Sequence, residues 1–126
     1  MCAIDALAKV DYPDARVGTR FKKYIRRRLK ELEAHADEIY NAFRCGIVHE
    51  ARAKEGAELS LENNVTVMPD PGNSGIELNP KLLVENVRSA LRSQMLEIAG
   101  DPEKAHAFKI YLLEQFSVEL TAVNTD

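Results

Sequence analysis

Arg44 and His49 are the two residues whose types and spacing best suit a chemical reaction. Histidine titrates near neutral pH and can both take and give a proton, which cleavage of RNA by its own 2′-hydroxyl requires. Arginine keeps its charge throughout that pH range, and its planar fork fits the crowded phosphate of the transition state. The pair is therefore a candidate for RNA cleavage that needs no metal ion.

The spacing of this pair limits how the two side chains can meet. Residues five apart on an ideal helix are separated by about 140°, because each residue turns about 100°. A loosened turn at Gly46, or the length of the arginine, would have to bring them together. A two-fold dimer would also do so, since Arg44 of one protomer could then serve the partner subunit's His49.

The alternative is a structural role for the same two residues. Arg44 would then be a cation near a helix end, where the helix dipole favours positive charge. His49 would donate a hydrogen bond to a backbone carbonyl beside the core. The two interpretations differ in what the side chains face: a cleft open to solvent, or the packing of the protein itself.

The segment from Tyr40 to Glu50 resembles the HEPN superfamily of compact helical bundles, whose active members carry an arginine and a histidine near a helix end with four to six residues between them. Arg44 and His49 match that motif, and the run from Gly75 to Asn79 is similar to one in small bacterial HEPN-like proteins. The resemblance implies a metal-independent ribonuclease that pairs two motifs in a homodimer, with RNA as substrate and an antitoxin protein as partner. Many superfamily members are non-catalytic, so a nucleic-acid-binding or protein-interaction module is the alternative function.

A basic segment supplies the second set of candidate residues. Residues 16–30 hold eight of the 17 basic residues of the chain and no acid. A local concentration of positive charge attracts phosphates whatever the net charge of the protein. The alternative is a solvated helix face whose positive charges are balanced by nearby acids such as Glu31, Glu33, Asp37 and Glu38. The nucleic-acid-binding candidates are Lys22, Lys23, Arg26 and Arg27.

Metal ions and cofactors are not expected. His35, His49 and His106 lie far apart, and no pair of cysteines or histidines has the spacing of metal ligands. The sequence also lacks the glycine-rich loops that hold nucleotide phosphates. Its two cysteines suggest no disulfide framework, and no apolar run approaches the roughly 20 residues of a membrane-spanning helix. We therefore expect a cytoplasmic protein without a membrane partner.

Apolar residues at steps of three and four predict helices in the first half of the chain. One covers residues 1–10 and ends before the turn-forming run from Asp11 to Asp14. A second begins near residue 16. A third carries Ile39, Tyr40 and further apolar residues up to 47, and no strong breaker marks the boundary between the two.

Short alternating runs and two marked helix starts follow. The runs 65–67 and 76–78 flank a segment rich in proline and glycine, which predicts a β-hairpin over about 64–79. Asn79 and Pro80 predict the start of a helix that Gly100 ends, and Asp101 and Pro102 predict the start of the last one.

These elements predict a mainly α fold, an antiparallel bundle of about five helices with a small inserted hairpin. The chain of 126 residues has the length of one domain, 45% hydrophobic and 29% charged residues, and a net charge of −3. We expect a single HEPN-like domain over residues 1–120 and a frayed tail over 121–126.

Overall fold

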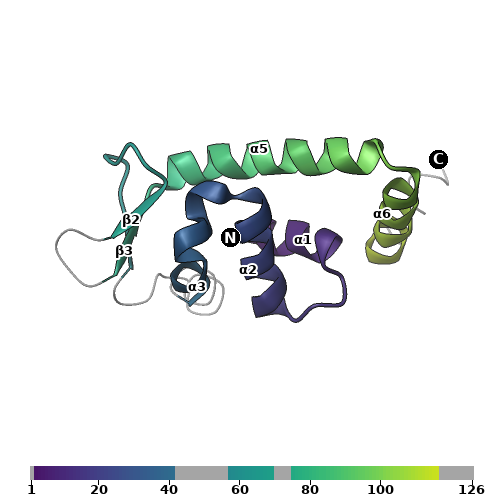
Figure 1. Ribbon diagram of the computed structural model, residues 1–126, viewed down its shortest axis with the longest axis horizontal. Coiled ribbons are helices and arrows are strands. Elements are labelled where there is room, and N and C mark those ends of the chain that lie inside the picture. Colours follow the sequence, from purple (N-terminus) through teal and green to yellow (C-terminus); the bar gives the residue numbers. More distant parts are fainter. Residues whose placement is uncertain (1, 42–56, 70–74, 117–126) are drawn as a thin grey trace. The chain divides into compact units, whose positions relative to one another are not determined.

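The computed structural model describes residues 2–41, 57–69 and 75–116 (Figure 1). The chain divides into two compact units, Met1–Ala90 and Leu91–Asp126. The described residues are mainly helical and include a small three-stranded sheet. This confirms the predicted fold class, a mainly α protein with a small inserted β element.

Helices make up the first part of the chain. Helix α1 spans Cys2–Asp11, and α2 spans Val17–Arg28. A 3-10 helix, η1, follows over Lys30–His35 and leads into the single turn of α3, Ala36–Ile39. The boundary that the sequence left unclear lies at Leu29, whose φ of −122° and ψ of 68° take the backbone out of the helical region.

The sheet contains the predicted hairpin, whose first strand begins two residues later than the run 65–67, and one strand that was not predicted. Strands β2 (Val67–Pro69) and β3 (Ile76–Leu78) are antiparallel, with Val67 opposite Leu78. Strand β1 (Ala57–Leu59) pairs with β3 in parallel, so the strand order is β1-β3-β2. Gly75, just before β3, has a φ of 146°, a backbone angle that residues with a Cβ rarely adopt.

Both helices of the C-terminal part begin where the sequence predicted. Helix α5 spans Pro80–Ala99, and Asn79 Oδ1 accepts hydrogen bonds from the backbone N–H groups of Lys81 (3.0 Å) and Leu82 (3.3 Å). Helix α6 spans Pro102–Gln115, and Asp101 Oδ1 caps it in the same way. Such caps satisfy N–H groups that have no partner within the helix.

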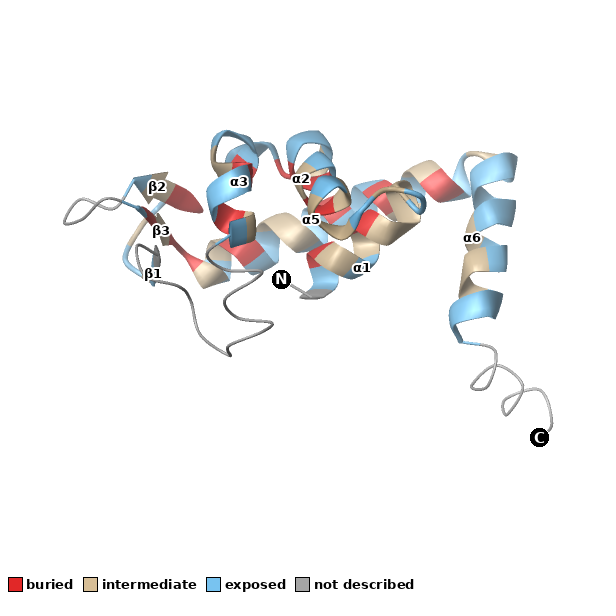
Figure 2. Cartoon of the chain, turned by 90° about the horizontal axis from the view of Figure 1, so that it is seen from below, coloured by how far each residue is buried: buried red, intermediate tan, exposed pale blue. Residues whose placement is uncertain are grey.

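The hydrophobic core lies in the first unit and joins its helices to its sheet. Figure 2 shows the buried positions of α2 and α3 in red, and α6 in only the colours of intermediate and exposed residues. Because the core draws on every described element of the first unit except β1, these elements fold together. The core consists of Ile4, Ala8, Phe21, Tyr24, Ile25, Leu29, Leu32, Ala36, Ile39, Val67, Ile76, Leu78, Leu83 and Ala90.

Candidate nucleic-acid interface

Helix α2 has an apolar side and a basic side. Phe21, Tyr24 and Ile25 are fully buried, and they fix which side of the helix faces the core. The other positions of this helix include six cations and no acid. Lys23, Arg26 and Arg27 are exposed, and Lys22 is half-buried. All four predicted nucleic-acid-binding residues therefore lie on a helix whose orientation the core sets.

Asp37 contacts two of these four cations. Lys22 Nζ lies 3.0 Å from Asp37 Oδ1, and Arg26 NH2 lies 3.5 Å from Asp37 Oδ2. Asp37 stands on α3, which follows α2 after the turn at Leu29 and η1. The hydrogen bond from Lys22, and then the charges of Lys22 and Arg26, hold the pKa of Asp37 below its ordinary value. The carboxylate is thus negatively charged at neutral pH and faces the two cations.

Tyr40 contacts both the core side of α2 and Lys22. Its ring packs against the ring of Phe21, with centroids 5.4 Å apart and planes tilted by 58°. Lys22 Nζ lies 5.2 Å from the centroid of the Tyr40 ring, a cation–π contact. Lys22 is therefore held between a carboxylate and an aromatic face.

Three other basic residues of this region, Lys23, Arg20 and Arg16, have different surroundings. Lys23 Nζ lies 5.5 Å from the centroid of the Tyr12 ring, and Arg20 NH1 donates to the carbonyl of Ala15 at 3.3 Å. Arg16, at the N-cap position of α2, is exposed, and its side chain does not cap the helix. For Arg16, Arg20 and Lys23, no ion pair with an acid occurs among the described residues.

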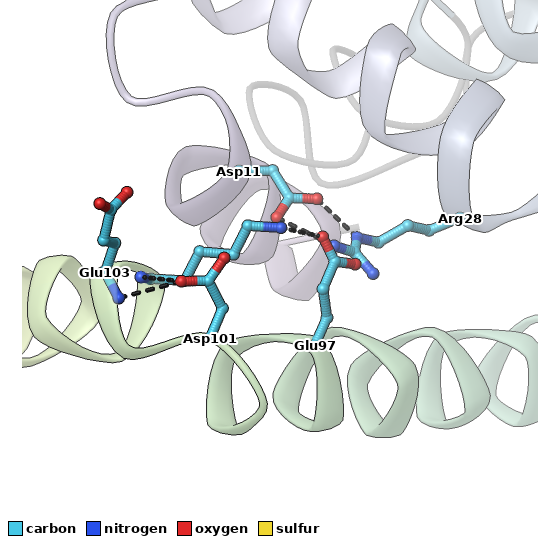
Figure 3. A network of polar contacts seen from close by, with 6 residues as sticks. Asp11, Arg28, Glu97, Asp101 and Glu103 are labelled. Carbon is cyan, nitrogen blue, oxygen red and sulfur yellow. Dashed lines mark hydrogen bonds and ion pairs between the residues drawn. The ribbon is translucent and has the colours of Figure 1, made fainter.

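Arg28 lies on the core side of α2 and has a structural partner. Its Nε donates to Asp11 Oδ2 at 2.5 Å and its NH2 donates to Asp11 Oδ1 at 3.2 Å, with the two side chains 6% and 8% exposed (Figure 3). The guanidinium also stands 6.0 Å from the centroid of the Tyr24 ring. Burial raises the pKa of Tyr24 to about 12. Arg28 is therefore part of the fold rather than of the basic surface.

The candidate catalytic pair, Arg44 and His49, lies outside the described residues. The last element described before the pair is α3, Ala36–Ile39. Of the other two histidines, His35 is 2.7 Å from Glu38 Oε2 through its Nδ1 atom, and His106 is exposed on α6. In the described part of the chain, no group of three or more histidine, cysteine or acidic side chains could hold a metal ion.

Every helix in the described ranges is too short or too polar to cross a lipid bilayer. Comparisons with models of protein families, with curated proteins and with solved structures found no match for this chain.

Two features of the interface were not visible as a pattern in the sequence. The proximity of Asp37 to Lys22 and Arg26 depends on the turn at Leu29, although Asp37 was among the acids expected to answer the basic run. The pairing of Arg28 with Asp11 joins residues 17 positions apart. The absence of acids between residues 16 and 30 was the signal that led to the interface.

Proposed function

We propose that this protein binds nucleic acid, RNA in particular, through the basic side of α2. The observation that supports this function is one helix with several exposed cations and no acid, fixed against the core by Phe21, Tyr24 and Ile25. Cations held on a rigid helix bind phosphates and release the counterions that surround a polyanion. A site of this kind positions the nucleic acid without reading its bases.

An anionic membrane is a less suitable ligand for the same surface. A helix that binds a lipid surface inserts its apolar side between the lipids. The apolar side of α2 is buried in the core and is not free to insert. The phosphates of a nucleic acid need only the cations.

Measurements of RNA binding at several salt concentrations test this function. We expect the affinity of the wild type for a mixed-sequence RNA to fall steeply between about 50 and 200 mM salt. Replacing Lys22, Lys23, Arg26 and Arg27 by glutamine should weaken binding and flatten its dependence on salt. A matched control removes four exposed cations of α5 and α6, Lys81, Arg88, Arg92 and Lys109. Equal losses in the two variants, or equal binding to anionic vesicles, would contradict a specific role for α2.

A second function, cleavage of the bound RNA, is supported by the sequence motif of Arg44 and His49. In this proposal His49 carries the proton and Arg44 stabilises the phosphate charge of the transition state. His49→Ala should lower the cleavage rate by roughly 10²–10⁴-fold, and Arg44→Lys should also fail because an ammonium cannot reproduce the guanidinium fork. Cleavage should persist in EDTA. A wild type that leaves varied RNAs intact would exclude this activity while the binding function stands.

The partners and the location that follow from the resemblance form part of the same proposal. A ribonuclease of this kind would pair Arg44 and the partner subunit's His49 in a homodimer, would act in the cytoplasm and would be held inactive by an antitoxin protein. Light scattering at micromolar concentration tests whether the protein is a homodimer. A mass near that of one chain, 14.1 kDa, would contradict the dimer.

A further inference from the structure

The two edges of the sheet differ in the backbone groups that they present. Strands β1 and β2 lie on either side of β3, so each forms an edge among the described residues (Figure 2). At the β2 edge Pro69 has no N–H group, and a proline on an edge strand hinders the addition of another strand. Strand β1 contains no proline. In the described part of the chain, β1 is therefore the edge better suited to accept a further strand.

The backbone of Leu59 faces away from the sheet. The N–H of Ser60 donates to the carbonyl of Leu78 at 3.0 Å, and Leu59 lies beside Leu78 in the parallel register. Successive residues of a strand direct their N–H and C=O groups to opposite sides, so Glu58 and Ser60 bond to β3 while Leu59 points outward. Among the described residues, no backbone hydrogen bond from this outer side is formed. The N–H and C=O groups of Leu59 are thus available to an added strand.

The side chains of β1 lie on two different faces of the sheet. Leu59 shares a face with Leu78, which is 1% exposed in the core, but Leu59 itself is 55% exposed. Leu61, just beyond the strand, is exposed as well. Glu58 lies on the opposite face beside Glu77 and is exposed. The apolar face of the sheet therefore continues to its edge, where part of it remains uncovered.

We propose that the β1 edge binds an extended segment of another protein in which apolar and basic residues alternate. This interaction goes beyond RNA binding and does not depend on it. An antiparallel strand would exchange two hydrogen bonds with Leu59 and place one of its residues directly opposite Glu58. A lysine or arginine at that position would form a cross-strand pair of opposite charge, and the next residue, an apolar one, would cover Leu59.

The charge of this region favours a basic partner over a second copy of the chain. Residues 55–80 contain five acids and no lysine or arginine. If β1 paired with its own copy in the antiparallel register that uses all three residues, Glu58 would face Glu58 of the partner subunit. The Cα atoms of such a pair are about 4.5 Å apart, and like charges at that position destabilise the pairing. The carboxylate of Glu58 therefore disfavours self-pairing and favours a strand with basic residues.

Binding of labelled peptides to the full chain tests this interaction. The probe is a short peptide, blocked at both ends, in which valine and lysine alternate. One control peptide has the same composition with its valines and lysines in separate blocks, and another has glutamine in place of lysine. In fluorescence anisotropy the glutamine peptide should bind up to about fivefold more weakly, because one pair of opposite charges contributes up to about 1 kcal/mol. The block peptide should bind more weakly than the probe, because it cannot match both faces of the edge.

Two substitutions separate strand pairing from charge. Leu59→Pro removes an N–H group that points away from β3, so the sheet should remain intact while binding of the probe falls by about tenfold. Glu58→Lys should make the lysine peptide bind more weakly than the glutamine peptide, the reverse of the order in the wild type. The matched control is Glu85→Lys, which reverses an exposed acid on α5 and should leave that order unchanged.

Amide hydrogen exchange, measured by NMR, gives a readout specific to strand addition. The probe peptide should slow the exchange of the Leu59 N–H, which gains a hydrogen bond. It should leave the exchange of the Ser60 N–H nearly unchanged, because that group already donates to Leu78.

Several outcomes would overturn the proposal. These are no binding of the probe, equal binding of the probe and the block peptide, or binding that Leu59→Pro leaves intact. Protection of the Leu59 N–H before any peptide is added would mean that a segment of the chain itself occupies the edge. A wild-type dimer that Leu59→Pro converts to a monomer in light scattering would identify a second copy as the occupant. If circular dichroism shows that Leu59→Pro is not folded, the peptide order in Glu58→Lys and the exchange of Leu59 decide.

Discussion

The ring of Tyr40 lies directly over Gly18, so close that a side chain at this position would require the ring to shift. A Cβ on Gly18 would stand 3.1 Å from both the CZ and the OH atoms of Tyr40. Tyr40 is held in this position by Phe21 on one side and by the ammonium of Lys22. The glycine in the first turn of α2 therefore allows the close approach of the residue that follows α3.

Gly18→Ala should destabilise the protein although alanine is the better helix former. In an unhindered helix the change from glycine to alanine stabilises by roughly 0.5–1 kcal/mol. Here the added methyl group would displace the Tyr40 ring, and overpacking of this kind costs roughly 1–3 kcal/mol. Urea unfolding of the single variant should show a net loss. In a Tyr40→Ala background the same substitution should stabilise, and an effect of equal sign in both backgrounds would contradict the contact.

Arg28→Met should cost roughly 3–5 kcal/mol of stability, because it removes the bidentate partner of the buried Asp11 carboxylate. The neighbouring substitution Arg27→Met is the control, since Arg27 is exposed and surface changes stay within about 0.5 kcal/mol. Replacing both partners, Asp11→Leu/Arg28→Met, should recover most of the loss, because no buried charge is then left. Thermal unfolding of the four proteins measures these differences. A small effect of Arg28→Met would mean that the pair is more open to water than its exposure indicates.

Asn79→Ala should destabilise more than an ordinary cap removal. The side chain accepts two hydrogen bonds at the start of α5, and its Nδ2 donates to the carbonyl of Asn63 at 2.7 Å. Loss of a cap costs about 1 kcal/mol, and the Asn63 carbonyl would lose a partner beside a residue that is 3% exposed. Asn79→Asp separates the two contributions because it keeps the acceptor and removes the donor. Chemical denaturation should rank wild type above the aspartate variant, and the alanine variant last.

Local signals predicted the elements of this fold well, and contacts between distant residues account for what was missed. Asn79 with Pro80, and Asp101 with Pro102, mark helix starts because capping depends on adjacent residues. The hairpin followed from two alternating runs around a proline- and glycine-rich segment. Strand β1 escaped prediction because a three-residue strand in parallel pairing carries little periodic signal and depends on β3, 19 residues further along.

The same distinction applies to the interface. The absence of acids among residues 16–30 predicted a basic helix, and the fully buried Phe21, Tyr24 and Ile25 orient it. The ion pairs of Asp37 with Lys22 and Arg26 depend on the turn at Leu29, which brings α3 back beside α2. Nothing in the residues around 29 marks that turn, because leucine and lysine are ordinary helix formers.

Tyr24 should make the protein sensitive to alkaline pH. Its pKa rises from 10 in the unfolded chain to about 12 in the folded protein, because burial disfavours the phenolate. Below pH 10 the phenol is neutral in both the folded and the unfolded state, so its titration does not lower the free energy of unfolding. Between pH 10 and 12 the unfolded chain loses the proton while the folded protein keeps it, so the free energy of unfolding falls with rising pH.

The full loss would be roughly 2–3 kcal/mol, from the size of the pKa difference. Tyr24→Phe removes this group and should flatten the decline over that range, although it also removes the hydroxyl and its interactions. Tyr111→Phe is the matched control, because Tyr111 lies half-buried on α6 outside the core. The measurement is denaturant unfolding at several pH values from 9 to 12. If Tyr24→Phe declined as steeply as the wild type and Tyr111→Phe did not, burial of Tyr24 would not be the cause.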